Sequence, residues 1–187
     1  MTQINKNKAT QVTTGLVRLS YEHLWEPAPV NDNGDLKYSA SFLIKPDDKV
    51  TLKAIEKAVE AAIELGISKC WGGKKPSTLQ LPLHDGNDKE DIIYAGHMYV
   101  NAKSSPKNKP WIVDRRKASI DDTSEVYSGC YGYAAISFYP FNTNGNKGVG
   151  CGVNGFMKVK DGDPLANRIS ADDAFDGIDI EEDDLLD

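Results

Sequence analysis

Cysteine is scarce in this sequence, and no long apolar run is present. The three cysteines, Cys70, Cys130 and Cys151, are odd in number and widely spaced, which argues against a disulfide framework. No stretch approaches the roughly 18 consecutive apolar residues that a membrane helix needs. The N-terminal residues, MTQINKNKATQ, are polar from the start and lack the apolar segment of a secretion signal. We therefore expect a cytoplasmic protein.

Signatures of nucleotide-dependent and zinc-dependent chemistry are missing as well. The chain has no G-x-x-x-x-G-K-[ST] phosphate loop, and His23, His84 and His97 form no paired ligand spacing with the cysteines. The segment from Gly150 to Gly155 matches G-x-G-x-x-G, but its surroundings indicate a strand on both sides rather than the strand-to-helix turn of a dinucleotide site. We expect no cofactor and no metal.

Clustered carboxylates leave one enzymatic alternative open. Metal-dependent nucleases hold their ion with such groups, although carboxylates in turns are more often simply solvated. No nucleophile with a nearby base is evident from spacing, so we predict no catalytic residue and no enzyme activity. The carboxylates that a nuclease would use are Asp85, Asp88 and Asp91, or Asp121 and Asp122.

Charge is divided unevenly along the chain. The last eighteen residues, Ser170 to Asp187, carry nine carboxylates and no Lys or Arg. The whole chain has 22 basic and 28 acidic residues, net −6, so residues 1–169 retain 22 basic and 19 acidic residues, net +3. A mildly basic body with an acidic appendage suits a protein that binds a polyanion and shields its own site. A solvated tail that aids solubility explains the charge equally well.

Hydrophobic alternation predicts mostly strands. The length suits one domain with tails, and a helical stripe predicts a single helix over about 48–65, capped by Asp47 or Asp48 and ended by Gly66. Strands and helices do not alternate, so we predict an all-β or mainly β fold, a small antiparallel barrel of five to six strands with inserted loops. The predicted strands begin near Thr13 and cover Leu36–Lys45, Ile92–Ala102, Trp111–Val113, Val126–Phe141 and Val149–Lys160. Residues 1–12 are predicted to form a flexible arm.

The strand Val126–Phe141 has an unusual outer face. Its even positions are apolar and indicate a core face, whereas its odd positions carry phenol rings. Aromatic rows on a sheet stack nucleobases, which all offer a π-face. Packing beneath a covering loop explains the rings equally well, and glycines in the strand would shift the alternation by forming bulges. The candidate stacking residues are Tyr127, Tyr131, Tyr133 and Tyr139.

A basic segment with an indole at its centre precedes that strand. Cations neutralise phosphates and an interleaved ring stacks a base, a mixture that suits single-stranded nucleic acid better than duplex. A similar but smaller group is present earlier in the chain. The candidates are Lys103, Lys107, Lys109, Trp111, Arg115, Arg116 and Lys117, opposed only by Asp114, and Trp71 with Lys74 and Lys75.

Six blocks of sequence, in fixed order, resemble one family. They are Tyr38-Ser-Ala-Ser-Phe-Leu-Ile-Lys45, Trp71-Gly-Gly-Lys74, Tyr94-Ala-Gly-His97, Val126-Tyr-Ser-Gly-Cys-Tyr131, Gly145-Asn-Lys-Gly-Val149 and Lys160-Asp-Gly-Asp-Pro-Leu165. Together they resemble a bacteriophage and prophage family of single-stranded DNA-binding proteins, long catalogued as a domain of unknown function and comparable to the T7-type phage protein. The resemblance extends from about Gly15 into the tail.

The resemblance implies an OB-fold DNA-binding domain over 13–165 and a disordered acidic tail over 166–187. It implies sequence-independent, non-catalytic binding of single-stranded DNA in phage replication or recombination. The expected location is the cytoplasm of the infected bacterium. Whether the chain forms a homo-oligomer is left open. Such tails recruit replication or recombination enzymes and compete with DNA. Known tails end in an aromatic residue, whereas this one ends in Leu185-Leu186-Asp187. An RNA-binding protein remains the main alternative. The expected partner-binding residues are Phe175, Asp179, Glu181, Glu182, Asp183, Asp184, Leu185 and Leu186.

Overall fold

The computed structural model describes residues 8–165 and contains one α-helix and eight strands. Their bounds, with those of two short 3₁₀ helices, are η1 Lys8–Thr10, β1 Gln11–Thr13, β2 Val17–Pro29, β3 Leu36–Ile44, α1 Lys49–Lys69, β4 Leu83–Asp85, η2 Gly86–Asp88, β5 Met98–Ser104, β6 Trp111–Val113, β7 Tyr131–Thr143 and β8 Asn146–Lys160.

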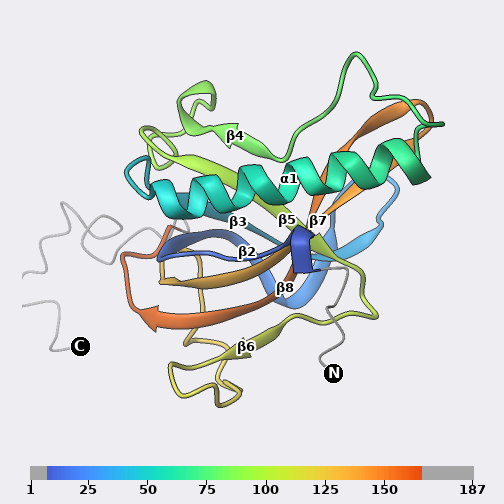
Figure 1. Cartoon of the computed structure of the whole chain (residues 1–187). Helices are drawn as coiled ribbons and strands as arrows, with labels where there is room; N and C mark the ends of the chain where they lie inside the picture. The colour runs from blue at the N-terminus through green and yellow to red at the C-terminus, as the bar shows by residue number, and fades with distance from the viewer. Residues whose placement is uncertain (1–7, 166–187) are drawn as a thin grey trace, which may run out of the picture.

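Five strands close into a ring in the order β2, β3, β5, β8, β7, because β7 pairs with both β2 and β8 (Figure 1). The ring resembles an OB-type barrel, and the prediction of a mainly β fold with one helix is confirmed. The prediction that the barrel is antiparallel throughout is wrong. β8 pairs in parallel with β5 and with β6, because the chain crosses over before it returns through the β7–β8 hairpin. Alternation in one strand carries no information about the direction of its neighbour.

The helix α1 begins where the sequence predicts, but it ends at Lys69, four residues beyond the predicted end. Asp48 caps it by accepting a hydrogen bond from the amide of Thr51, at 3.1 Å. Gly66 lies inside the helix instead of ending it. A Cβ at Gly66 would lie 2.6 Å from the ring of Trp71, which folds back onto the last turns. The helix lies across the barrel in Figure 1 and buries Ile55, Ala58 and Ala62 among other residues.

The interior of the barrel is filled by the inward-facing residues of the ring. Leu19, Phe42, Val100, Ile136 and Phe156 are fully buried, and the rings of Phe42 and Phe156 stack with centroids 6.1 Å apart. The inside of the ring is thus packed with apolar side chains, and the outward faces of its strands are the accessible ones. Within the described residues no helix is long and apolar enough to cross a membrane.

Three segments differ locally from the expectation. The predicted strand Val126–Phe141 begins only at Tyr131, so Tyr127 lies in the loop before β7. The predicted strand Ile92–Ala102 begins only at Met98, because residues 91–97 form turns held by hydrogen bonds such as that from Tyr94 N to Asp91 O. Of the predicted arm 1–12, residues 1–7 lie outside the described part of the chain. The remainder forms η1 and most of β1, which pairs with β7 from Gln11↔Ser137.

Candidate nucleic-acid interface

Successive residues of β7 alternate between a buried and an outward face, as the sequence indicates. Ala134, Ile136 and Phe138 point into the core and are at most 2% exposed. Tyr133 and Tyr139 point outward and expose 40% and 46% of their surface. The extra residues that shift the β7–β8 register lie in β8, so the alternation of β7 is preserved.

Strand β8 runs beside these tyrosines and presents glycine at successive outward positions, Gly150, Gly152 and Gly155. Aromatic rings lie directly on two of them. A Cβ at Gly150 would lie 2.6 Å from the ring of Tyr139, and a Cβ at Gly155 would lie 2.0 Å from the ring of Trp111. Glycine is therefore required at these two positions for the rings to lie flat against the strand.

The neighbouring strands add a cation and an indole to the same face. Lys103 of β5 is exposed and in register with Gly152, and Trp111 of β6 is in register with Gly155. The indole of Trp111 exposes 48% of its surface, whereas the next residue, Ile112, is buried. Lys109 lines a hollow with Trp111. Three predicted candidates from the basic segment, Lys103, Lys109 and Trp111, thus lie near the predicted tyrosines along β8.

Further cations lie at the far end of β8. Tyr131 is in register with Lys160, whose ammonium lies 4.9 Å from the centre of the ring, and the guanidinium of Arg18 lies 5.4 Å from it. Arg115 and Arg116 line a hollow with Lys160. We call this surface the β8 track. It consists of Gly150, Gly152, Gly155 and Lys160 of β8 with Lys103, Lys109, Trp111, Arg115, Arg116, Tyr131, Tyr133 and Tyr139.

Asp114 fixes the turn that presents the two arginines. Its carboxylate accepts hydrogen bonds from the amides of Arg116, at 2.8 Å, and Ala118, at 3.0 Å. Lys117 takes the left-handed conformation, with φ of 66°, so that the chain can return to pair Val113 with Ser119. The single acidic residue of the basic segment therefore organises its backbone, and the cations remain exposed.

The surroundings of two groups shift their pKa values in opposite directions. Burial against the strand raises the pKa of Tyr139 above its ordinary value, because a phenolate would lose hydration there. At the other end, hydrogen bonds from Lys158 and then from Tyr127 hold the pKa of Asp161 below its ordinary value. The ammonium of Lys158 lies 2.6 Å from Asp161 and 3.2 Å from Glu125, so its charge is already paired.

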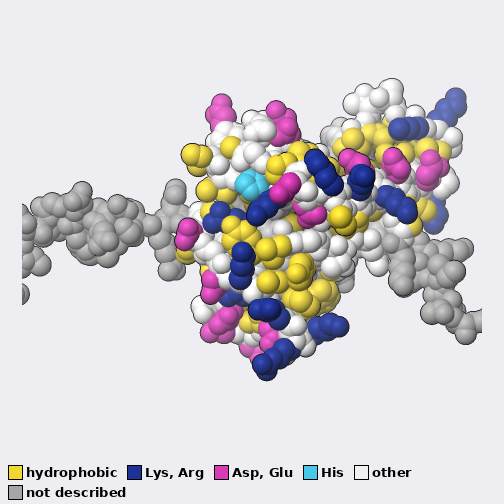
Figure 2. All heavy atoms as spheres, turned by 60° about the vertical axis from the view of Figure 1, so that its left-hand side comes forward, with side chains coloured by type: hydrophobic (Ala, Val, Ile, Leu, Met, Phe, Trp, Pro, Cys, Tyr) yellow, Lys and Arg dark blue, Asp and Glu magenta, His cyan; other side chains and the backbone are white. Residues whose placement is uncertain are grey.

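The track is long enough for several nucleotides. Ten residues separate Gly150 from Lys160, which corresponds to about 33 Å at roughly 3.3 Å per strand residue. Figure 2 shows hydrophobic side chains gathered near the centre of one face of the molecule, with Lys and Arg side chains around them and at its lower end.

Other predicted candidates lie away from the track. Trp71 is 6% exposed and donates a hydrogen bond from Nε1 to the carbonyl of Phe141, so its burial weighs against base stacking. Lys74 and Lys75 are exposed in the loop after α1. The hydroxyl of Tyr127 contacts Asp161 and Gly162, each at 3.0 Å. Exposed turns carry Lys107 and Lys117. The tail residues from Phe175 to Leu186 lie outside the described residues.

Three of the five carboxylates of the nuclease alternative stabilise turns. Asp85, Asp91 and Asp122 each accept a hydrogen bond from the amide two residues further on, at 2.9–3.0 Å. Between residues 8 and 165 there is no group of three or more His, Cys, Asp or Glu side chains placed to hold a metal ion.

Sequence reasoning missed a second aromatic cluster. The ammonium of Lys89 lies 4.0 Å from the ring centre of Tyr94, 4.8 Å from that of Tyr21 and 5.4 Å from that of Tyr99. Tyr94 is fully buried and its hydroxyl donates to Ser20. The surrounding loop is acidic, because Asp85, Asp88, Glu90 and Asp91 flank this one lysine. We infer that the cluster fixes the loop against the barrel. Tyr21 is far from Tyr94 and Tyr99 in the sequence, so no local pattern could have indicated the cluster.

Five strands closed into a barrel place the chain in the class of OB-type folds. Aromatic and basic side chains exposed along one strand are features that single-stranded nucleic-acid binders of this class share. The family described as "Enterobacter phage Enc34, ssDNA-binding protein" matches residues 10–186. The chain belongs to this family, whose members are non-catalytic binding proteins.

Individual relatives agree with the family assignment. The "Putative protein p50" of Acyrthosiphon pisum secondary endosymbiont phage 1 is 34% identical over 182 residues, covering 91% of this chain and 95% of that protein. The single-stranded DNA-binding protein from bacteriophage Enc34 in complex with ssDNA superimposes with a TM-score of 0.74 at 23% identity, over 86% of this chain and 94% of that one. The gp2.5 protein of bacteriophage T7, a single-stranded DNA-binding protein, gives 0.56 at 20% identity, over 86% and 97%. At these identities the two structures support the fold.

Proposed function

We propose that this chain binds single-stranded DNA, without catalysis and with little sequence preference, along the β8 track. The observation that carries the proposal is the row of half-exposed rings, Tyr139, Trp111 and Tyr133, set along a glycine-lined strand between exposed cations. Its family membership supports the same ligand.

The two kinds of side chain on the track have different tasks. Rings that lie flat against the strand offer an open face to a base, and each stacked base contributes about 1–3 kcal/mol. Lys103, Lys109, Arg115, Arg116 and Lys160 would neutralise phosphates. Release of condensed counterions then gives a log–log salt slope of about −3.5, from roughly −0.7 for each of five contacts on a single strand. A narrow row of rings cannot reach the stacked bases of a duplex, so single strands are preferred.

The acidic tail is proposed to compete with DNA for the track and to recruit replication or recombination enzymes. The segment before the tail is anchored at the Tyr131 end of the track. Arg18 donates a hydrogen bond to the carbonyl of Asp163, at 2.8 Å, and the amide of Leu165 donates to Ser128, at 2.9 Å. A flexible chain of the 22 residues that follow would span about 25 Å on average. Its carboxylates would therefore reach most of the track from this anchor.

The boundaries and setting are proposals that follow from the same interpretation. Residues 13–165 would form the DNA-binding domain, and residues 166–187 the regulatory tail. The expected location is the cytoplasm of the infected bacterial host, where phage DNA is replicated. A homo-oligomer on longer DNA is compatible with this arrangement.

Fluorescence anisotropy with a labelled dT oligomer of about 30 nucleotides, several OB-fold footprints long, tests the function. The salt series should give the slope stated above, and duplex of equal length should compete poorly. Deletion of residues 170–187 should tighten binding, most clearly at low salt where charges are least screened. Equal competition by a matched RNA would indicate the RNA-binding alternative. Absence of binding at low salt would refute the proposal.

A further inference from the structure

The sheet forks beside the track. β5 and β8 run parallel and pair only at Lys103↔Gly152. Before that point the edge of β5 pairs with β4, at Val100↔Leu83, while the edge of β8 pairs with Gln80, at Gly148. A hollow of about 620 Å³ lies in the fork, beside the segment that joins Leu79 to His84.

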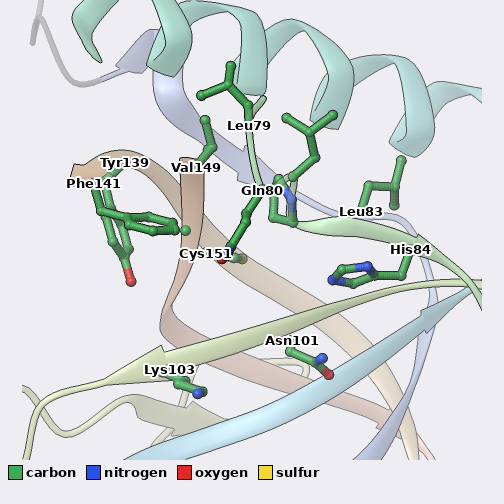
Figure 3. Close-up of a pocket in the computed structure, with 13 residues that line it drawn as sticks. Leu79, Gln80, Leu83, His84, Asn101, Lys103, Tyr139, Phe141, Val149 and Cys151 are labelled. Carbon is green, nitrogen blue, oxygen red and sulfur yellow. The ribbon is translucent and has the colours of Figure 1, made fainter. Parts of the chain in front are cut away.

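Apolar groups line much of this hollow. Figure 3 shows Tyr139 and Phe141 on one side, the chain around Leu79 and Gln80 above, and His84 on the other side. Leu81 also lines the hollow. It is 49% exposed, because no other part of the described structure covers it. The ring of Tyr139 can approach because Gly150 has no side chain. Such walls suit the flat, weakly polar faces of a nucleobase.

Asn101 places a hydrogen-bond donor at the edge of the hollow. Its Oδ1 accepts a hydrogen bond from the hydroxyl of Ser41, at 2.5 Å, and Ser41 is 5% exposed. This bond fixes the orientation of the amide, so the NH₂ group of Asn101 is the part left free to donate. The exposed side chain of Lys103 lies two residues further along the same face of β5 and also lines the hollow.

We propose that the fork is a nucleotide pocket in which one base of the bound single strand is held. The proposal rests on the proposed function and deepens it. The base would lie between Tyr139 and the Leu79–Leu81 segment, Asn101 would donate to a carbonyl or ring-nitrogen acceptor on its edge, and Lys103 would contact its phosphate. Ser41 is a positioning residue that acts through Asn101. The track would then combine open surfaces on which bases stack with one pocket that holds a base and discriminates against an abasic nucleotide.

Two substitutions, Asn101→Ala and Ser41→Ala, test the pocket against two ligands. The first probe is the shortest dT oligomer that binds the wild-type chain with full affinity. The second is an abasic sugar–phosphate oligomer of the same length. Both variants should lose about 2- to 12-fold in affinity for dT, as for one net hydrogen bond. Affinity for the abasic oligomer and the salt slope for dT should not change, because neither residue contacts phosphate. Asn33→Ala, in the exposed β2–β3 turn, is the matched control.

Each remaining outcome is decisive. Equal losses for both oligomers would mean that Asn101 contacts the backbone, and no loss for either would mean that no base enters the fork; both results overturn the proposal. Ser41 is buried, so thermal unfolding of Ser41→Ala checks that this variant still folds. Asn101 is exposed, so Asn101→Ala tests the pocket without replacing a buried residue. If the wild-type chain binds neither oligomer at low salt, the proposed function itself has failed.

Discussion

A single methyl group at Gly155 should remove Trp111 from the β8 track. The Cβ of an alanine would lie 2.0 Å from Cδ2 of the indole and 2.3 Å from Cε2, far inside van der Waals contact. Nearly half of the indole is exposed, so the ring can swing into solvent rather than force the strand apart. Gly155→Ala should therefore act on DNA binding mainly through Trp111.

The size of the effect follows from the loss of one stacked base. At about 1–3 kcal/mol per base, the affinity for single-stranded DNA should fall about 5- to 150-fold. The salt slope should stay unchanged, because no phosphate contact is lost. Trp111→Ala should weaken binding by a similar factor, and the double variant should be no weaker than either single variant, since both remove the same contact.

Gly152→Ala provides the matched control on the same strand and face. Its Cβ would meet nothing closer than 3.6 Å, an ordinary contact, so its affinity should stay within about twofold of the wild type. Anisotropy with a labelled dT oligomer measures the wild type and all four variants, and circular dichroism melts confirm that each chain is folded. Equal losses in Gly152→Ala and Gly155→Ala, or additive losses in the double variant, would refute the role assigned to Trp111.

Three further predictions concern charge, the core and pH. Arg116→Gln should lower the magnitude of the log–log salt slope by about 0.7, as expected for one phosphate contact on a single strand, whereas Lys57→Gln on the exposed face of α1 should leave it unchanged. An unchanged slope in Arg116→Gln would remove this residue from the interface. Trp71→Ala should lower the free energy of unfolding by about 3–5 kcal/mol in urea denaturation, because the indole is buried against Gly66, and the salt slope of the folded variant should match the wild type. Hydrogen bonds from Lys158 and Tyr127 lower the pKa of Asp161 in the folded chain. The ionised Asp161 carboxylate should therefore stabilise the fold fully above the ordinary aspartate pKa. This stabilisation should disappear as the pH falls through the lowered pKa of Asp161. Melting temperatures of the wild type and Asp161→Asn should therefore converge between about pH 6 and about pH 2.

The local patterns of the sequence were sufficient to predict the faces of β7. Alternation separated Tyr133 and Tyr139 from Ala134, Ile136 and Phe138, because a strand with one buried face must alternate. The helical stripe likewise predicted α1, and the basic segment indicated the loop and strand that carry Trp111. These features depend on residues close together in the chain.

The parts that sequence could not supply depend on distant pairings. Nothing in β5 or β8 alone indicates that they run parallel, that they separate after Lys103↔Gly152, or that Asn101 lies at the resulting fork. The glycines of β8 matched only a dinucleotide motif, although their role is to let rings lie on the strand. Trp71 and Trp111 have similar basic neighbours, yet Trp71 is buried because Gly66 leaves space for it in α1. That mid-helix glycine was a usable signal.

The most direct test of the β8 track is an amide NMR titration of the ¹⁵N-labelled full chain with a dT oligomer. Glycine amides resonate in a sparsely populated region of the spectrum, so Gly150, Gly152 and Gly155 can be followed individually. The account predicts that these three amides and the indole N–H of Trp111 shift together and saturably, while Gly66 and the indole N–H of Trp71 do not move. Shifts confined to α1 and the 71–75 loop, with the β8 glycines unchanged, would contradict it.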